Sequence, residues 1–155
     1  MKKILIFEYI TGGGLIEKKV DNSLLFEAEI ILNSLIETRN YEVNFFCDYR
    51  HRFRHKRGAI IVPKDNTEII YNSKFINKYD FYLPICPETH MIYYTYLKKI
   101  SDSVNNMNLS SAETILATSD KLTFRKICNK KNIPNSDSFD ISKRNQLYIE
   151  KDRTG

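Results

Sequence analysis

Apolar residues follow the chain in two rhythms, continuous runs of strand length and repeats with helical spacing. Residues 2–8 (KKILIFE) and 41–48 (YEVNFFCD) are continuous runs with the length and character of buried parallel strands. Between them, residues 21–40 carry apolar side chains at helical spacing, and Asn22 or Ser23 is suited to cap the start of the helix. This order of strand, helix and strand predicts a βαβ unit of an open, Rossmann-like sheet.

The pattern after the second strand predicts further β structure. AIIVP (residues 59–63) and TEIIY (residues 67–71) are short β-rich segments, and the KDN between them is typical of a turn. YDFYLPICPE (residues 79–88) is another apolar run, which Pro87 ends. We therefore expect an α/β domain built on a parallel sheet.

Helical spacing returns in the last third of the chain. Residues 89–104 and 120–132 both carry apolar side chains three or four positions apart. Ser110 or Ser111 is a suitable cap for a short helix in SAETILAT between them.

The final residues bear on the domain organisation. IPNSDSF predicts extended chain, and NQLYIEKDRTG (residues 145–155) predicts a strand that runs into a turn. Because an isolated strand cannot bury its face, we expect a truncated chain. The expected boundaries are a complete first domain at residues 1–108 and the start of a second domain at residues 109–155.

Composition favours a globular protein. Hydrophobic residues make up 42% of the chain and charged residues 28%, which is enough to bury a core. No run approaches the ~20 apolar residues of a membrane-spanning helix, and the apolar stretch after the initial Met-Lys-Lys is too short for a signal peptide. Cys47, Cys86 and Cys128 are scattered and odd in number, which favours reduced, buried thiols over disulfides or zinc ligands. We expect a cytoplasmic protein with no membrane partner.

The net charge of +5 owes much to one tract, YRHRFRHKRG, residues 49–58. Arg and Lys neutralise phosphates and Phe53 is of a type that stacks on bases, so nucleic-acid binding is one interpretation. A solvated loop or a surface that attracts anionic ligands is the other. Because no nucleic-acid-binding signature accompanies the tract, we expect no nucleic-acid partner.

Three of the five glycines, Gly12, Gly13 and Gly14, follow the first predicted strand. A triple glycine permits positive φ and close approach to a ligand, with its amides pointing outward. Open α/β sheets bind ligands at the carboxyl ends of their strands, where this loop is expected. The pattern is neither the dinucleotide-binding G-x-G-x-x-G nor a P-loop, so a ligand loop and a flexible turn both stay open.

Several stretches taken in order resemble the ATP-grasp ligases. They are ILIFEYITGGG, NSLLFEAEIILNSLIE with Glu27, ICPETHMIYYTYLKKI, SSAETILATSDKLTFRKICNKKNIPNS and LYIEKDRTG. Within that superfamily, the opening FEY-x-TGGG and the PET at a strand end are similar to the group of tyramine–glutamate ligases of methanofuran biosynthesis. The resemblance implies a Rossmann-like pre-ATP-grasp domain followed by the first elements of an ATP-grasp domain.

The most diagnostic stretch is TSDKLTFRKICNKKNIP, residues 118–134. Its Asp-Lys pair resembles the usual start of a short ATP-grasp helix, and Asn132 stands where glycine is typical. LYIEKDRTG is similar to a strand reading Val-Ile-Lys-Pro-x-x-Gly, with Asp152 in place of the proline. The resemblance implies that the ATP-binding residues are Lys121, Lys151 and Gly155.

Substrate binding is expected at two strand ends, from Glu8, Thr11, Gly12, Gly13, Gly14 and Glu88. Glu8 is suited to a substrate ammonium group, but it is equally suited to cap a backbone amide. The PET sequence is equally consistent with Thr89 as a helix cap, and His90 favours a helix-surface or packed position over a catalytic base.

The resemblance implies a reaction as well as a fold. An ATP-grasp ligase forms an acyl phosphate from a carboxylate and ATP, and an amine then attacks it to give an amide. The Mg²⁺ ligands of such an enzyme lie late in the second domain and are not in this sequence, so no metal ligand is assigned and we expect this chain to be inactive by itself. The expected partners are a small-molecule amine and carboxylate, with a homodimer left open. The alternative is a stand-alone Rossmann-like binding or regulatory module without catalysis.

Overall fold

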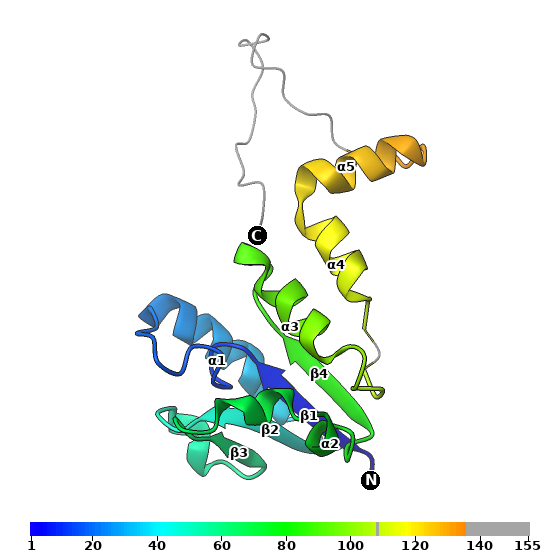
Figure 1. Ribbon diagram of the computed structural model, residues 1–155. Helices are drawn as coiled ribbons and strands as arrows, with labels where there is room; N and C mark the ends of the chain where they lie inside the picture. The colour runs from blue at the N-terminus through cyan, green and yellow to red at the C-terminus, as the bar shows by residue number, and fades with distance from the viewer. Residues whose placement is uncertain (108, 136–155) are drawn as a thin grey trace.

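The computed structural model describes residues 1–107 and 109–135 (Figure 1). The described part contains an open sheet of four parallel strands in the order β3-β2-β1-β4. Ile4 of β1 pairs with Val43 of β2 and with Phe81 of β4. The predicted α/β class and the parallel, Rossmann-like sheet are therefore confirmed. The strands are β1 (Lys3–Glu8), β2 (Glu42–Asp48), β3 (Ala59–Val62) and β4 (Phe81–Ile85).

Helix α1 (Asn22–Ile36) connects β1 to β2, as the helical spacing predicts. Its N-cap is Asp21, whose carboxylate accepts a hydrogen bond from Ser23 N at 2.8 Å. The prediction that Asn22 or Ser23 caps the helix was therefore wrong, because Asp21 already has the extended backbone of a cap and reaches the free amide. The helix ends at Ile36, four residues before the end of the segment 21–40 that was predicted to be helical.

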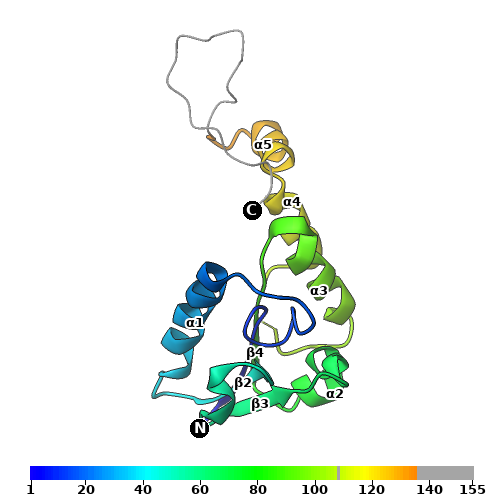
Figure 2. The same cartoon turned by 90° about the vertical axis from the view of Figure 1, so that its left-hand side faces the viewer.

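Both faces of the sheet are covered, because the side chains of each strand alternate between them. Leu5 and Phe7 of β1 point into one core cluster and Ile6 into the other. Figure 2 shows α1 on one side of the sheet, with α2 (Ser73–Ile76) and α3 (Ile92–Ile100) on the opposite side. The buried runs of the sequence are thus explained by a sheet with protein on both faces.

TEIIY is a 3₁₀ helix, η2 (Thr67–Tyr71), and the prediction of a β segment there was wrong. Ile70 is buried, and Asn72 both accepts a hydrogen bond from Phe75 N at 3.1 Å and donates its own N–H to Ile69 O at 3.1 Å. The backbone N–H of Asn72 therefore closes the end of η2 and its side-chain oxygen caps α2, so the run of β-branched residues reports burial and not an extended backbone.

The helix predicted over residues 89–104 is shorter in the structure. A 3₁₀ turn, η3 (Thr89–Met91), precedes α3, and His90 and Met91 have φ angles of 53° and 59°. Two successive residues in the left-handed region cannot continue a helix, so α3 begins only at Ile92.

The last described helices are α4 (Ala112–Ser119) and α5 (Lys121–Lys130). Ser111 caps α4 by accepting from Thr114 N at 3.2 Å, which confirms one of the two predicted caps. Asp120 caps α5 through Leu122 N and Thr123 N, at 3.0 and 3.1 Å. α4 packs on α3 and α5 packs on α4. The predicted strand at residues 145–155 lies outside the described residues, and the proposed domain boundary stays a prediction.

Among the described residues, no helix has both the length and the apolar character needed to cross a bilayer.

Candidate functional site

The glycine loop, residues 9–14, follows β1 at the carboxyl edge of the sheet. Gly12 N donates to Glu8 O at 2.7 Å, and Gly14 N donates to Tyr9 O at 2.8 Å. The expectation that the amides of this loop point outward was therefore wrong for Gly12 and Gly14. Gly13 has a φ of +102°, which explains why a glycine is needed at that position.

Glu8 and Thr11 hold the loop in this shape. Glu8 is 4% exposed, and its Oε2 accepts hydrogen bonds from both Thr11 N and Thr11 Oγ1 at 2.7 Å. Ile10 N donates to Glu8 Oε1 at 3.2 Å, and Thr11 O accepts from Asp48 N of β2 at 2.7 Å. The carboxylate thus caps backbone amides, which was the alternative to substrate binding, and a substrate role for Glu8 and Thr11 stays a prediction.

The strand order reverses between β1 and β4, which is where open α/β sheets bind ligands. The loop is tied to β4 here, since Tyr9 N donates to Ile85 O at 2.9 Å. Burial raises the pKa of the nearby Cys86 thiol, and the negative charge of Glu8 raises it further. Because the thiol is held protonated, Cys86 is a poor nucleophile.

The turn after β4 carries exposed polar groups on a strained backbone. Glu88 is exposed and makes no side-chain cap, Thr89 is not a cap, and His90 is exposed on the turn. Each left-handed non-glycine residue costs about 1–2 kcal/mol. Nothing in the sequence signals this geometry, because histidine and methionine are ordinary helix residues. Glu88 follows the end of β4 by three residues, at the carboxyl edge of the sheet.

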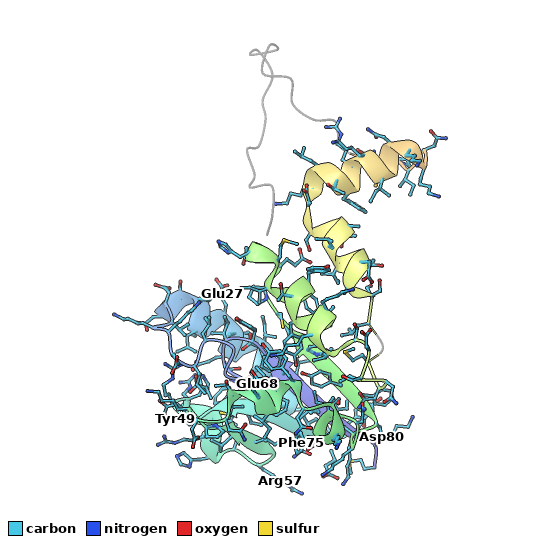
Figure 3. The ribbon with its side chains drawn as sticks, viewed as in Figure 1. Glu27, Tyr49, Arg57, Glu68, Phe75 and Asp80 are labelled. Carbon is cyan, nitrogen blue, oxygen red and sulfur yellow. The ribbon has the colours of Figure 1, made fainter. Side chains whose placement is uncertain are left out.

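One pocket opens beside the glycine loop on the side of η2 and α3. It has a volume of about 250 Å³, and its lining includes Gly13, Gly14, Glu68, Tyr71 and Lys99. Lys99 Nζ lies 3.1 Å from Glu68 Oε2 and 3.5 Å from the centre of the Tyr71 ring; Figure 3 labels Glu68 near the middle of the molecule. The two predicted glycines thus line a pocket in which Lys99 and Glu68 are paired with each other, and Glu17 and Lys18 add further charges to its lining.

A second pocket, called here the β2 pocket, opens on the other side of the loop. It also has a volume of about 250 Å³, and its lining includes Ile10, Lys18, Lys19, Asp48, Arg50 and His51. Sequence reasoning missed Asp48, Arg50 and His51 as site residues, because they lie in or next to the basic tract that was interpreted as surface.

Arg50 fixes one wall of the β2 pocket. Its guanidinium contacts both carboxylate oxygens of Asp48, with Nη2 2.6 Å from Oδ2 and Nε 3.0 Å from Oδ1. The same guanidinium donates to Leu15 O at 2.9 Å and to Lys18 O at 3.1 Å. It therefore ties the segment after the glycines to the end of β2.

His51 forms a buried wall of the same pocket. Its Nδ1 accepts from Phe53 N at 3.2 Å, and its Nε2 lies 3.2 Å from Glu29 Oε1 on α1. Burial lowers the pKa of His51, although the charge of Glu29 acts in the opposite direction. Glu29 is also paired with Arg52. Phe53 is 4% exposed, so its ring is buried and is not presented for stacking on a base; the expectation of no nucleic-acid partner stays a prediction.

The predicted ATP-binding residues lie away from this edge or outside the described part. Lys121 is the first residue of α5 and is exposed. Figures 1 and 2 both show α5 standing apart from the sheet, so Lys121 and the glycine loop are not brought together. Lys151 and Gly155 lie outside the described residues. Within the described ranges there is no group of three or more His, Cys, Asp or Glu side chains placed to hold a metal ion.

Comparison with known proteins gives one informative likeness. No protein-family model matches the chain, and no curated protein is significantly similar to it. A crystal structure of a protein from Archaeoglobus fulgidus, provisionally assigned to the ATP-grasp superfamily, is similar with a TM-score of 0.64 and 26% sequence identity. The match covers 84% of this chain and 40% of that one. The α/β fold is therefore shared with an ATP-grasp superfamily protein, which supports the predicted resemblance at that level.

Proposed function

We propose that this chain is part of an ATP-dependent carboxylate–amine ligase that forms an amide through an acyl phosphate. The observation that carries the proposal is the fold likeness to the Archaeoglobus fulgidus protein over 84% of the chain. The start of α5 supports it as well, because Asp120 and Lys121 stand at the beginning of a short helix, where the ATP-grasp resemblance expects an Asp-Lys pair. In its more specific form, the proposal names tyramine as the amine substrate and glutamate as the carboxylate substrate. Since the chain spans 40% of that relative's length, the activity belongs to the whole protein.

The described residues fit ATP in one respect. Lys121 is an exposed residue in the first turn of α5, and an ammonium on a flexible stem suits a nucleotide phosphate. Bound ATP would supply the phosphoryl group for the acyl phosphate. In this proposal Lys121, Lys151 and Gly155 bind the phosphates. Mg²⁺ does not fit the described residues, so no step is assigned to a metal here.

The substrate side of the proposed enzyme is the carboxyl edge of the sheet. Gly13 and Gly14 line a pocket there, and Glu88 is exposed at the end of β4. An exposed carboxylate attracts a cationic amine, whereas Glu8 shapes the loop from within. A small-molecule amine and a small carboxylate are the partners proposed for this edge. The proposed enzyme is cytoplasmic, and a homodimer is neither proposed nor excluded.

The decisive experiment uses the full-length protein. ADP release should require both an amine and a carboxylate, and hydroxylamine in place of the amine should trap the acyl phosphate as a hydroxamate. Lys121→Ala should lower kcat/KM for ATP by roughly tenfold or more, because a charge-assisted phosphate contact is lost. Lys126→Ala, an exposed lysine on the same helix, is the control and should have no effect. ADP release without any amine or acid, or no ADP release at all, would reject the ligase.

A second candidate, a binding or regulatory module, is favoured by one observation. Both pockets at the carboxyl edge are lined by residues of this chain, and neither lining includes Lys121, the predicted ATP-binding residue that falls within the described ranges. Such a module would bind its ligand equally well with and without ATP. A ligase should instead show ATP-dependent turnover, so the full-length assay separates the two.

A further inference from the structure

The β2 pocket has apolar walls and a defined size. Ile10 is 5% exposed, and Val20 and Leu25 are half-buried, so hydrocarbon lines much of the cavity. The volume of about 250 Å³ is many times the ~10–15 Å³ that a single buried water needs by the same measure, so the pocket has room for a small organic molecule. Such a molecule fits with its apolar part against these three side chains.

The pocket is preformed. The segment that carries Lys18 is held to β2 by the Arg50 hydrogen bonds to Leu15 O and Lys18 O. The His51 ring is held by the hydrogen bond from Phe53 N to Nδ1, and Glu29 lies beside Nε2. Little ordering free energy is therefore spent when a ligand enters, which favours binding even of a small molecule.

The charged groups around the pocket differ in whether a partner of opposite charge neutralises them. Asp48 is neutralised by Arg50, and Glu29 by Arg52. Burial lowers the pKa of His51, so its ring adds no charge near neutral pH. Lys18 and Lys19 are exposed on the rim, and neither forms an ion pair with another described residue.

The start of α1 does not supply this charge. Its first amides are already capped by Asp21, which accepts from Ser23 N at 2.8 Å and is itself negative. The positive potential at the pocket is therefore that of the two rim ammonium groups.

We propose that the β2 pocket binds a small organic carboxylate, with its hydrocarbon or aromatic body against Ile10, Val20 and Leu25 and its carboxylate at Lys18 and Lys19. An apolar wall favours the body of such a ligand, and the rim lysines favour its anionic end. The proposal does not depend on the ligase, because it concerns binding by this chain without ATP.

The test measures binding of a matched pair of probes to the 155-residue chain by NMR. Hexanoate and hexanamide have the same size and differ in charge. The chain is labelled with ¹⁵N-histidine, so that His51 reports on the pocket while His55 and His90 report on other surfaces. Hexanoate should shift the His51 signals with a dissociation constant on the order of 1 mM, as expected for so few atoms. Hexanamide should bind several-fold more weakly.

Rim variants locate the charge. The double variant Lys18→Gln, Lys19→Gln should weaken hexanoate binding roughly three- to tenfold, as expected for two exposed charges, and leave hexanamide binding unchanged. Lys64→Gln removes the same kind of charge from an exposed position outside the pocket lining and should change neither. Inorganic phosphate should not displace hexanoate.

Several results would overturn the proposal. They are no shift at His51, shifts of all three histidines together, equal affinity for hexanoate and hexanamide, an equal loss in the Lys64 variant, and displacement by phosphate. Failure here would leave the ligase assay untouched, and failure of the ligase assay would leave this binding test untouched.

Discussion

Replacing Gly12 with alanine tests whether packing closes the glycine loop. The new Cβ would lie 2.5 Å from Glu8 O and 2.9 Å from the Phe7 ring. Since the same carbonyl accepts the Gly12 N–H at 2.7 Å, the backbone must separate to admit the methyl group. Overpacking costs about 1–3 kcal/mol and the weakened hydrogen bond about 1 kcal/mol. We therefore expect Gly12→Ala to lower the free energy of unfolding by about 2–4 kcal/mol.

Urea unfolding followed by circular dichroism measures this loss. The midpoint should fall while the slope stays the same, because the surface exposed on unfolding does not change. Glu17→Ala is the matched control, as an exposed residue just after the same loop, and should stay within about 0.5 kcal/mol of the parent. If Gly12→Ala stays within that same range, the loop has spare room and the packing argument is refuted.

Three further predictions concern side chains around the carboxyl edge and the core beneath it. Arg50→Gln leaves the buried Asp48 carboxylate without its guanidinium and should cost about 1–2 kcal/mol of unfolding free energy in urea titrations. Burial lowers the pKa of His51 below its ordinary value of 6.5, so the folded state disfavours the protonated ring. The free energy of unfolding should therefore fall as the pH drops below 6.5. His51→Asn should flatten that fall in unfolding experiments from pH 8 to pH 5. Tyr96→Phe should destabilise the protein by about 1 kcal/mol more than Tyr82→Phe in thermal or urea unfolding, because the Tyr96 hydroxyl links the Tyr82 hydroxyl to a backbone carbonyl at 2.7 Å.

For each of these three predictions, a specific result would contradict the reasoning. Adding Asp48→Asn to the Arg50 variant should restore part of the lost stability, and a double variant no more stable than the single one would show that the pair is not the cause. The exposed His55→Asn serves as the histidine control, and an equal effect of both histidine variants on the pH slope would remove the argument from burial. Equal losses in the Tyr82 and Tyr96 variants would show that the chain of hydroxyl groups is not formed.

Much of the fold could be predicted because burial on both faces leaves a simple signal. The runs of β1, β2 and β4 are continuous, and α1 carries the helical repeat. TEIIY shows where this signal fails, because Ile70 needs burial and a 3₁₀ turn provides it as well as a strand does. Asn72 ends the turn through local hydrogen bonds, from its own N–H to Ile69 O and from Phe75 N to its side-chain oxygen, which the run of apolar residues does not reveal.

The site was harder to predict than the fold. The triple glycine marked the correct edge, but the sequence reports the freedom of Gly12 and Gly14 and not which carbonyl accepts each N–H. Arg50 and His51 were missed for a related reason. A basic tract suggests a solvated surface, and only the folded chain shows that Asp48 and Glu29 turn part of it inward.

These observations assign two functions to the carboxyl edge, maintaining the shape of the glycine loop and binding a ligand, and variants can separate them. The amides of Gly12 and Gly14 are used within the loop, so neither of them is available to a ligand at this edge. Replacement of Gly12 should therefore act on stability, whereas a change at Lys18 or Lys19 should act on affinity. Gly12→Ala, studied under conditions where it is still folded, should bind hexanoate as the parent does, because its defect lies in the packing beneath the pocket. If this variant instead loses hexanoate binding while its stability is unchanged, the loop contacts the ligand through its backbone, and the division between loop and rim is wrong.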